Sequence, residues 1–160
     1  MIRIGLISDT HGLLRPEAVD VLRGSDFIVH AGDIGEDVLD RLATLAPVTA
    51  VRGNNDRAPW AARLAETEYL RFGEVTLMVL HDLADLGADP GASSVDVVVS
   101  GHSHRPKVER RGGVLYVNPG SAGPVRFRLP ISVALLQIVG REVDARIVEL
   151  ESLRQDAALR

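Results

Sequence analysis

Histidine, aspartate and asparagine side chains gather in four short motifs of this 160-residue chain. The motifs are Asp9-Thr10-His11, Gly32-Asp33, Gly53-Asn54-Asn55-Asp56 and Gly101-His102-Ser103-His104. His81 stands apart from them, directly after the apolar run Val75–Leu80. Carboxylate oxygens and imidazole nitrogens suit Mn²⁺, Fe²⁺, Zn²⁺, Co²⁺ or Ni²⁺. The pattern therefore predicts a binding site for a pair of divalent transition-metal ions.

Seven side chains form the predicted ligand set, and four of the five histidines of the chain are among them. They are Asp9, His11, Asp33, Asn54, His81, His102 and His104. Two ions held about 3.5–4 Å apart need a short carboxylate between them, and Asp33 is our candidate because it lies centrally in this order. The positive charge left on such a site would attract a phosphate anion and lower the pKa of bound water.

Four further residues are candidates for supporting the ligands or contacting a substrate: Asn55, Asp56, His30 and Arg126. His30 ends a predicted strand three residues before Asp33, which favours a buried, supporting position. For Asp56 we favour orientation of a ligand over direct coordination. Arg126 offers a guanidinium to a phosphate, although most arginines are simply solvated. The Gly53–Asp56 run by itself would be an ordinary turn, and only its context makes Asn54 a ligand.

The elements that must position these motifs are indicated by the spacing of apolar residues. In the first half, strands are predicted at 2–7, 26–30 and 47–51, and helices at 16–22 and 36–45. This βαβαβ order implies parallel strands joined by right-handed crossovers. In the second half, strands are predicted at 69–72, 75–81, 95–100, 107–111, 114–117, 131–139 and 142–150, and the tail 152–160 is helix-permissive.

Each ligand motif follows the end of a predicted strand, where the loops of an α/β sheet form the ligand crevice. Side chains that are spread over more than ninety residues can therefore converge. Glycine turns join the later strands into hairpins, which suggests two sheets packed face to face with helices outside. The length predicts a single domain over residues 1–160.

Composition restricts the class of protein. An apolar fraction of 46% and a charged fraction of 25% are typical of a globular protein, and the lack of cysteine excludes thiolate chemistry and disulfides. No apolar run approaches the roughly 20 residues of a membrane helix, and the N-terminus is a poor signal peptide, so we expect a cytoplasmic protein without a membrane partner. The net charge of −4 argues against a surface that coats nucleic acid, but it does not exclude a local basic patch that contacts nucleic acid.

As an ordered set from Ile4 to Ser121, these motifs resemble the calcineurin-like metallophosphoesterase superfamily. The short length and Asn118-Pro119-Gly120-Ser121 resemble its small single-domain bacterial and archaeal phosphodiesterase branch. The resemblance implies an α/β fold, namely a four-layer α/β/β/α sandwich of two mixed β-sheets flanked by helices. It also implies a phosphoric diester hydrolase acting on a small-molecule or nucleotide-type phosphoester, and it leaves a homo-oligomer open.

The resemblance further implies a role for each ligand. Asp9, His11, Asp33 and His104 would hold the first ion, and Asp33, Asn54, His81 and His102 the second. Water bridging the two ions would attack phosphorus in line. We expect the two divalent metal ions to be Mn²⁺, with Fe, Zn, Ni and Co as alternatives.

Two residues depart from the pattern of the superfamily. Many members carry a histidine directly after the motif asparagine, where it aids the leaving group, but this chain carries Asn55. The protein acid or base is therefore unknown, and diesters or good leaving groups are favoured. Asp82 follows His81 where relatives often have glycine. The alternative function is a non-catalytic protein-interaction scaffold on the same fold, as in the small retromer subunit, and a non-catalytic sensor is a third option.

Overall fold

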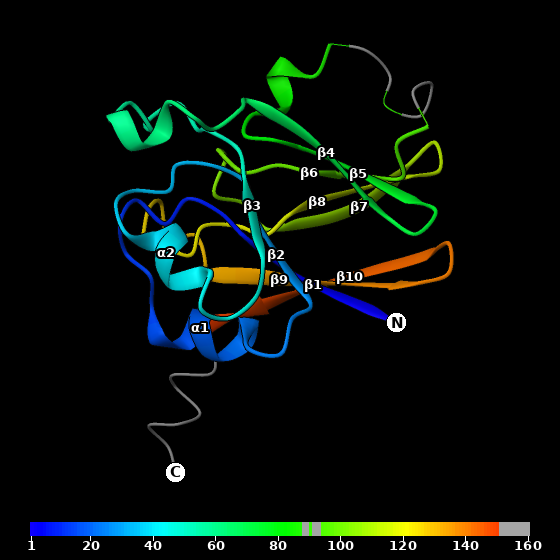
Figure 1. Ribbon diagram of the computed structural model, residues 1–160, viewed down its shortest axis with the longest axis horizontal. Helices are drawn as coiled ribbons and strands as arrows, with labels where there is room; N and C mark the ends of the chain where they lie inside the picture. The colour runs from blue at the N-terminus through cyan, green and yellow to red at the C-terminus, as the bar shows by residue number, and fades with distance from the viewer. Residues whose placement is uncertain (88–89, 91–93, 151–160) are drawn as a thin grey trace.

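The computed structural model describes residues 1–87, 90 and 94–150. Two five-stranded β-sheets pack face to face, and helices cover the outside of the first sheet (Figure 1). This architecture confirms the predicted α/β sandwich of two mixed sheets flanked by helices. The predicted helix-permissive tail at 152–160 lies outside the described residues.

The first sheet has the strand order β10-β9-β1-β2-β3. Its strands are β1 (Ile2–Ile7), β2 (Phe27–His30), β3 (Val48–Ala50), β9 (Ser132–Val139) and β10 (Glu142–Glu149). β1, β2 and β3 are parallel because α1 (Pro16–Leu22) and α2 (Val38–Leu42) carry the chain back between them. β9 pairs antiparallel with both β1 and β10, so the sheet is mixed.

The second sheet has the strand order β4-β5-β6-β8-β7. Its strands are β4 (Thr67–Phe72), β5 (Val75–Leu80), β6 (Val97–Val99), β7 (Lys107–Arg111) and β8 (Val114–Asn118). The hairpin pairs β4–β5 and β7–β8 are antiparallel, whereas β5, β6 and β8 run parallel. Two 3-10 turns, η1 (Pro59–Ala61) and η2 (Leu83–Asp85), lie in the connections.

Both faces of β1 are buried, which explains its almost continuous apolar sequence. Ile4 and Leu6 pack into the layer between the two sheets, with Val79 and Val99 from the second sheet. Ile7 belongs to the other layer, between the first sheet and the helices. Complete burial of such a side chain contributes about 1.5–3 kcal/mol, so these two layers hold β1 firmly.

Three predicted elements are clearly shorter than expected: the strand predicted at 47–51 is observed as β3 (Val48–Ala50), the strand predicted at 95–100 is observed as β6 (Val97–Val99), and one helix is also shorter. The helix predicted at 36–45 is observed only as α2, because Asp37 has a φ of 64° and cannot extend a right-handed helix. Beyond Leu42 the chain tightens into turns, in which the amide of Leu45 donates to the carbonyl of Leu42. On the outside of the second sheet, the described residues form only a thin layer. There the partly buried Leu86 packs against the apolar cluster that contains Leu80.

The carboxyl ends of the parallel strands of both sheets lead into loops that contact one another. The Ala122 amide donates to the Ser8 carbonyl at 3.0 Å, and the Gly101 amide donates to the His81 carbonyl at 2.9 Å. These contacts gather the motif-bearing loops at one end of the sandwich. In the described part of the chain, no helix has the length and apolar character required to cross a bilayer.

Candidate metal centre

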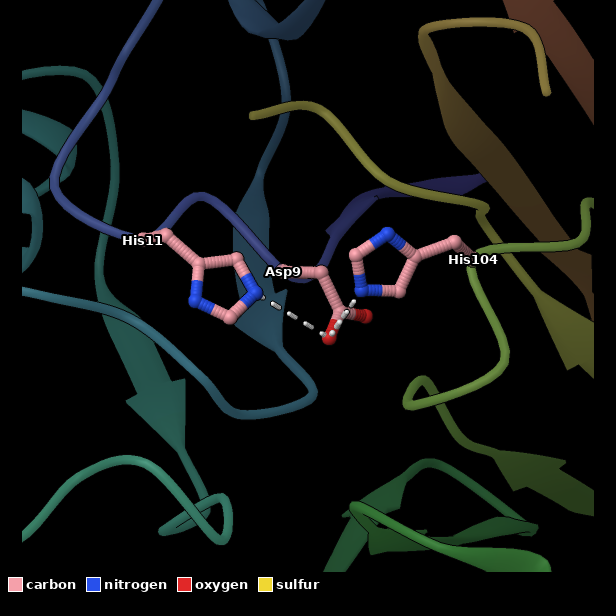
Figure 2. Close-up of side chains that lie close together, drawn as sticks. All are labelled: Asp9, His11 and His104. Carbon is pink, nitrogen blue, oxygen red and sulfur yellow. Dashed lines mark ion pairs between the residues drawn. The ribbon is translucent and has the colours of Figure 1, made fainter. Parts of the chain in front are cut away.

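Two imidazoles flank the Asp9 carboxylate and form with it one group of three side chains (Figure 2). His104 Nε2 lies 3.4 Å from Asp9 Oδ1, and His11 Nε2 lies 3.9 Å from the same oxygen. Figure 2 shows both imidazoles directed toward this carboxylate from opposite sides. The structure thus brings together three of the side chains predicted for the first ion.

A second group joins Asp9 to Asp33 and His81. His81 Nε2 lies 3.3 Å from Asp33 Oδ2 and 3.9 Å from Asp9 Oδ1. Asp33 Oδ2 also lies 3.8 Å from His11 Nε2. Both carboxylates therefore stand between imidazoles of the two groups, which is the position that a bridging ligand requires.

The two remaining predicted ligands, Asn54 and His102, are more exposed. His102 Nδ1 lies 3.3 Å from His81 Nε2, and the two rings meet edge to face. Asn54 lines a pocket of about 480 Å³ together with His81 and His102. The structure therefore brings all seven predicted ligands to one end of the sandwich. Asn54 is assigned to this end because it lines the same pocket as His81 and His102.

Buried polar atoms in this centre lack protein partners. Asp9 Oδ2 accepts hydrogen bonds from Ser8 Oγ at 2.7 Å and from the His102 amide at 3.1 Å. Asp9 Oδ1 and His11 Nε2, which face each other, have no hydrogen-bond partner among the described residues. Leaving a buried polar atom unpaired costs about 1–3 kcal/mol. This nitrogen and oxygen donor set fits a divalent transition-metal ion.

Most of the predicted ligands adopt a backbone conformation that is rare outside glycine. Five of the seven have positive φ, namely Asp9 (54°), His11 (48°), Asp33 (57°), His102 (71°) and His104 (62°). Each such residue costs on the order of 1 kcal/mol, and such strain clusters at functional sites. The sequence signal for this conformation is residue type, because Asp, Asn and His adopt positive φ more readily than other non-glycine residues.

Asn55 holds the Asp33 carboxylate with two hydrogen bonds. Its backbone amide donates to Asp33 Oδ1 at 2.9 Å, and its side-chain amide donates to Asp33 Oδ2 at 3.0 Å. Burial raises the pKa of Asp33, but hydrogen bonds from His81 and Asn55 outweigh burial and hold that pKa well below its usual range. Asp33 is therefore ionised and ready to bind a cation at neutral pH.

Two other side chains, Asp56 and Ser121, fix the loops around the predicted ligands. Buried Asp56 accepts hydrogen bonds from the amides of Ile34 and Gly53, each at 2.9 Å, so it joins the loop of Asp33 to the loop of Asn54. Ser121 Oγ donates to the Asp9 carbonyl at 3.0 Å. Nothing in the sequence marks Ser8 for such a role, whereas Ser121 stands in the Asn118-Pro119-Gly120-Ser121 turn.

Arg126 lies within electrostatic reach of the centre. Burial lowers the pKa of His104, the Asp9 carboxylate opposes this shift, and the charge of Arg126 adds to the lowering. The Arg126 side chain is exposed, which is compatible with a contact to substrate and equally with an ordinary solvated arginine.

His30 is fully buried beside the ligands. The Gly32 amide donates to His30 Nδ1 at 3.1 Å, so the ring proton is on Nε2, which faces Thr10 Oγ1 at 3.0 Å. Burial, followed by the nearby charge of His81, lowers the pKa of His30 from 6.5 to about 3. This arrangement suits the predicted supporting role.

We expect His30 to stay neutral, with its proton on Nε2, down to about pH 4. Because its folded pKa is below the unfolded value of 6.5, the associated stability is complete above pH 6.5 and is lost as the pH falls toward about 3. A ¹⁵N NMR titration of the imidazole in metal-free protein measures this directly. Titration near pH 6.5 would contradict the prediction.

The fold and this centre define a class of two-sheet α/β proteins that gather carboxylate and imidazole side chains at the strand ends. Residues 2–141 match the family model of the calcineurin-like phosphoesterase superfamily domain, and the chain belongs to that superfamily. Its membership confirms the resemblance drawn from the sequence motifs.

Three similar proteins illustrate the relationship. A protein of Methanothermobacter thermautotrophicus named "Probable metallophosphoesterase" is 41% identical, over 91% of each chain. Phosphodiesterase YfcE of Escherichia coli is 30% identical, over 85% of this chain and 88% of YfcE. The structure of Vps29 from Entamoeba histolytica complexed with Zn²⁺ superimposes with a TM-score of 0.71 and 25% identity, over 93% of this chain and 99% of that one. The chain is thus similar to small members of the superfamily along most of its length.

Proposed function

We propose that this chain is a metal-dependent phosphodiesterase with a dinuclear metal centre. The observation that carries the proposal is the set of buried donor atoms, in which Asp9 Oδ1 and Asp33 Oδ2 lie 3.3–3.9 Å from imidazole Nε2 atoms. The proposed ligands are Asp9, His11, Asp33, Asn54, His81, His102 and His104. When bound, two divalent ions supply a water of lowered pKa and a positive field for the phosphoryl oxygens.

The proposed division of the ligands follows the first observed group for one ion and begins from His81 of the second group for the other, although Asp9 takes part in both groups. Asp9, His11 and His104 serve the first ion, and His81, with Asn54 and His102, serves the second. Asp33 is the proposed bridge, because its Oδ2 faces His11 on one side and His81 on the other. Asn55 keeps this carboxylate from rotating out of the bridging position.

The Asn55 amide limits the leaving groups that the site handles well. An amide does not donate a proton as a general acid, and this one is already bonded to Asp33. We therefore expect the site to favour leaving groups that depart as stable anions, such as the phenolates released from aryl phosphodiesters. The printed name of the relative YfcE, a phosphodiesterase, supports the diester preference. We further propose Mn²⁺ as the native ion and a small-molecule or nucleotide-type substrate in the cytoplasm.

We expect the purified protein, stripped of metal and then given Mn²⁺, to hydrolyse bis-p-nitrophenyl phosphate and to stop when chelator is added. The melting temperature should rise with Mn²⁺, because only the folded chain gathers the seven ligands. Release of p-nitrophenolate and a thermal melt measure the two effects. Absence of turnover with Mn²⁺, Fe²⁺, Zn²⁺, Ni²⁺ and Co²⁺ would overturn the enzymatic proposal.

A protein-interaction scaffold is the second candidate, because the fold is shared with Vps29. All seven ligand positions of this chain carry ligand-competent side chains, whereas a retired site would be expected to carry an apolar replacement. The same assay separates the two candidates: metal binding without turnover of any phosphoester favours the scaffold.

A further inference from the structure

Asp82 lies between the second group of ligands and the turn η2. Its Oδ1 accepts a hydrogen bond from the Ala84 amide at 3.0 Å and so caps η2. Its Oδ2 lies 3.6 Å from His102 Nε2. Asp82 also lines the pocket that is bordered by Asn54, His81 and His102. One carboxylate thus makes two contacts with different consequences.

The contact with Asp82 affects which nitrogen of His102 carries the proton. An ionised carboxylate attracts a proton and accepts hydrogen bonds, so Asp82 Oδ2, 3.6 Å away, favours the neutral His102 tautomer that carries its proton on Nε2. Its other nitrogen, Nδ1, then presents a lone pair toward His81 Nε2, 3.3 Å away.

His81 is oriented in the same manner by the backbone. Its Nδ1 lies 2.7 Å from the Ala31 carbonyl, which only accepts, so a neutral His81 carries its proton on Nδ1. In that form its Nε2, which lies 3.3 Å from Asp33 Oδ2, offers a lone pair to a cation. When both rings are neutral in these tautomers, their lone pairs face each other at 3.3 Å and repel unless a cation stands between or beside them. A shared metal ion satisfies both nitrogens.

We infer that Asp82 is a positioning residue, which holds His102 in the tautomer whose Nδ1 binds the second ion. This inference rests on the proposed function, because it requires that an ion binds there. A carboxylate that accepts the outer N–H of a metal-binding histidine fixes the tautomer and ring orientation, and its loss typically costs about 10- to 100-fold in metal affinity.

The decisive variant is Asp82→Asn, with Asp85→Asn as its matched control. The asparagine oxygen can still accept from the Ala84 amide, so the cap of η2 is kept while the amide NH₂ faces His102. A donor at that position favours the proton on His102 Nδ1, which is the wrong tautomer for the ion. Asp85 lies in the same turn and lines the same pocket, and among the described ion pairs it has none to His102.

We expect calorimetric titration with Mn²⁺ to show one of two binding events weakened about 10- to 100-fold in Asp82→Asn and unchanged in Asp85→Asn. In metal-free protein, ¹⁵N NMR should show the His102 proton moving from Nε2 toward Nδ1 only in Asp82→Asn. Equal affinities in the two variants, or an unchanged tautomer, overturn the inference alone. A wild-type protein that binds no Mn²⁺ overturns the proposed function together with it.

Discussion

Replacement of Asp33 by alanine should remove both metal ions and reduce phosphodiester turnover on the order of a thousandfold. The reason is its position, because Asp33 Oδ2 lies 3.3 Å from His81 Nε2 and 3.8 Å from His11 Nε2. Without this oxygen both ions lose a ligand and the charge that holds them together. Metal ions contribute several kcal/mol of transition-state stabilisation, and about 1.4 kcal/mol corresponds to a factor of ten.

Elemental analysis after desalting gives the metal content of Asp33→Ala, and the bis-p-nitrophenyl phosphate assay gives its turnover. Asp40→Ala is the matched control, because it removes an exposed carboxylate from the following helix. Asn55→Ala provides a graded comparison: it removes one of two hydrogen bonds to Asp33, and we expect both ions to stay. Equal metal content in Asp33→Ala and the wild type would refute the bridging role.

Replacement of Gly101 by alanine should lower the free energy of unfolding by about 3 kcal/mol. A Cβ at this position would overlap Ser8 Oγ and would lie 2.7 Å from Asp9 Oδ2. Both neighbours are completely buried, so neither side chain can move away without breaking the hydrogen bond from Ser8 to Asp9. The substitution should also weaken metal binding, because it displaces a carboxylate shared by both groups of ligands.

Urea unfolding of metal-free protein tests this effect separately from metal binding. Gly87→Ala is the control, since its added Cβ would meet nothing within 4 Å among the residues that the structure describes, and a change of at most about 0.5 kcal/mol is expected. Coincident unfolding midpoints for the two variants would show that the packing argument for Gly101 is wrong.

Local sequence patterns were sufficient to predict most of the strands. The bounds predicted for β1 (Ile2–Ile7) and for α1 (Pro16–Leu22) match those observed. Apolar runs and glycine turns act over a few residues, so they can be interpreted without knowledge of distant contacts. The length of α2 was predicted wrongly because the left-handed conformation of Asp37 is not encoded in apolar spacing.

Residue types at the strand ends can be read without coordinates, and they were enough to name the candidate ligand set. How these side chains are held became apparent from the packed fold. The His102 amide reaches Asp9 across 93 positions of the chain, and Asn55 reaches Asp33 across 22. Such contacts depend on how two sheets pack and on positive φ at non-glycine residues, and both are set by the whole fold rather than by neighbours in sequence.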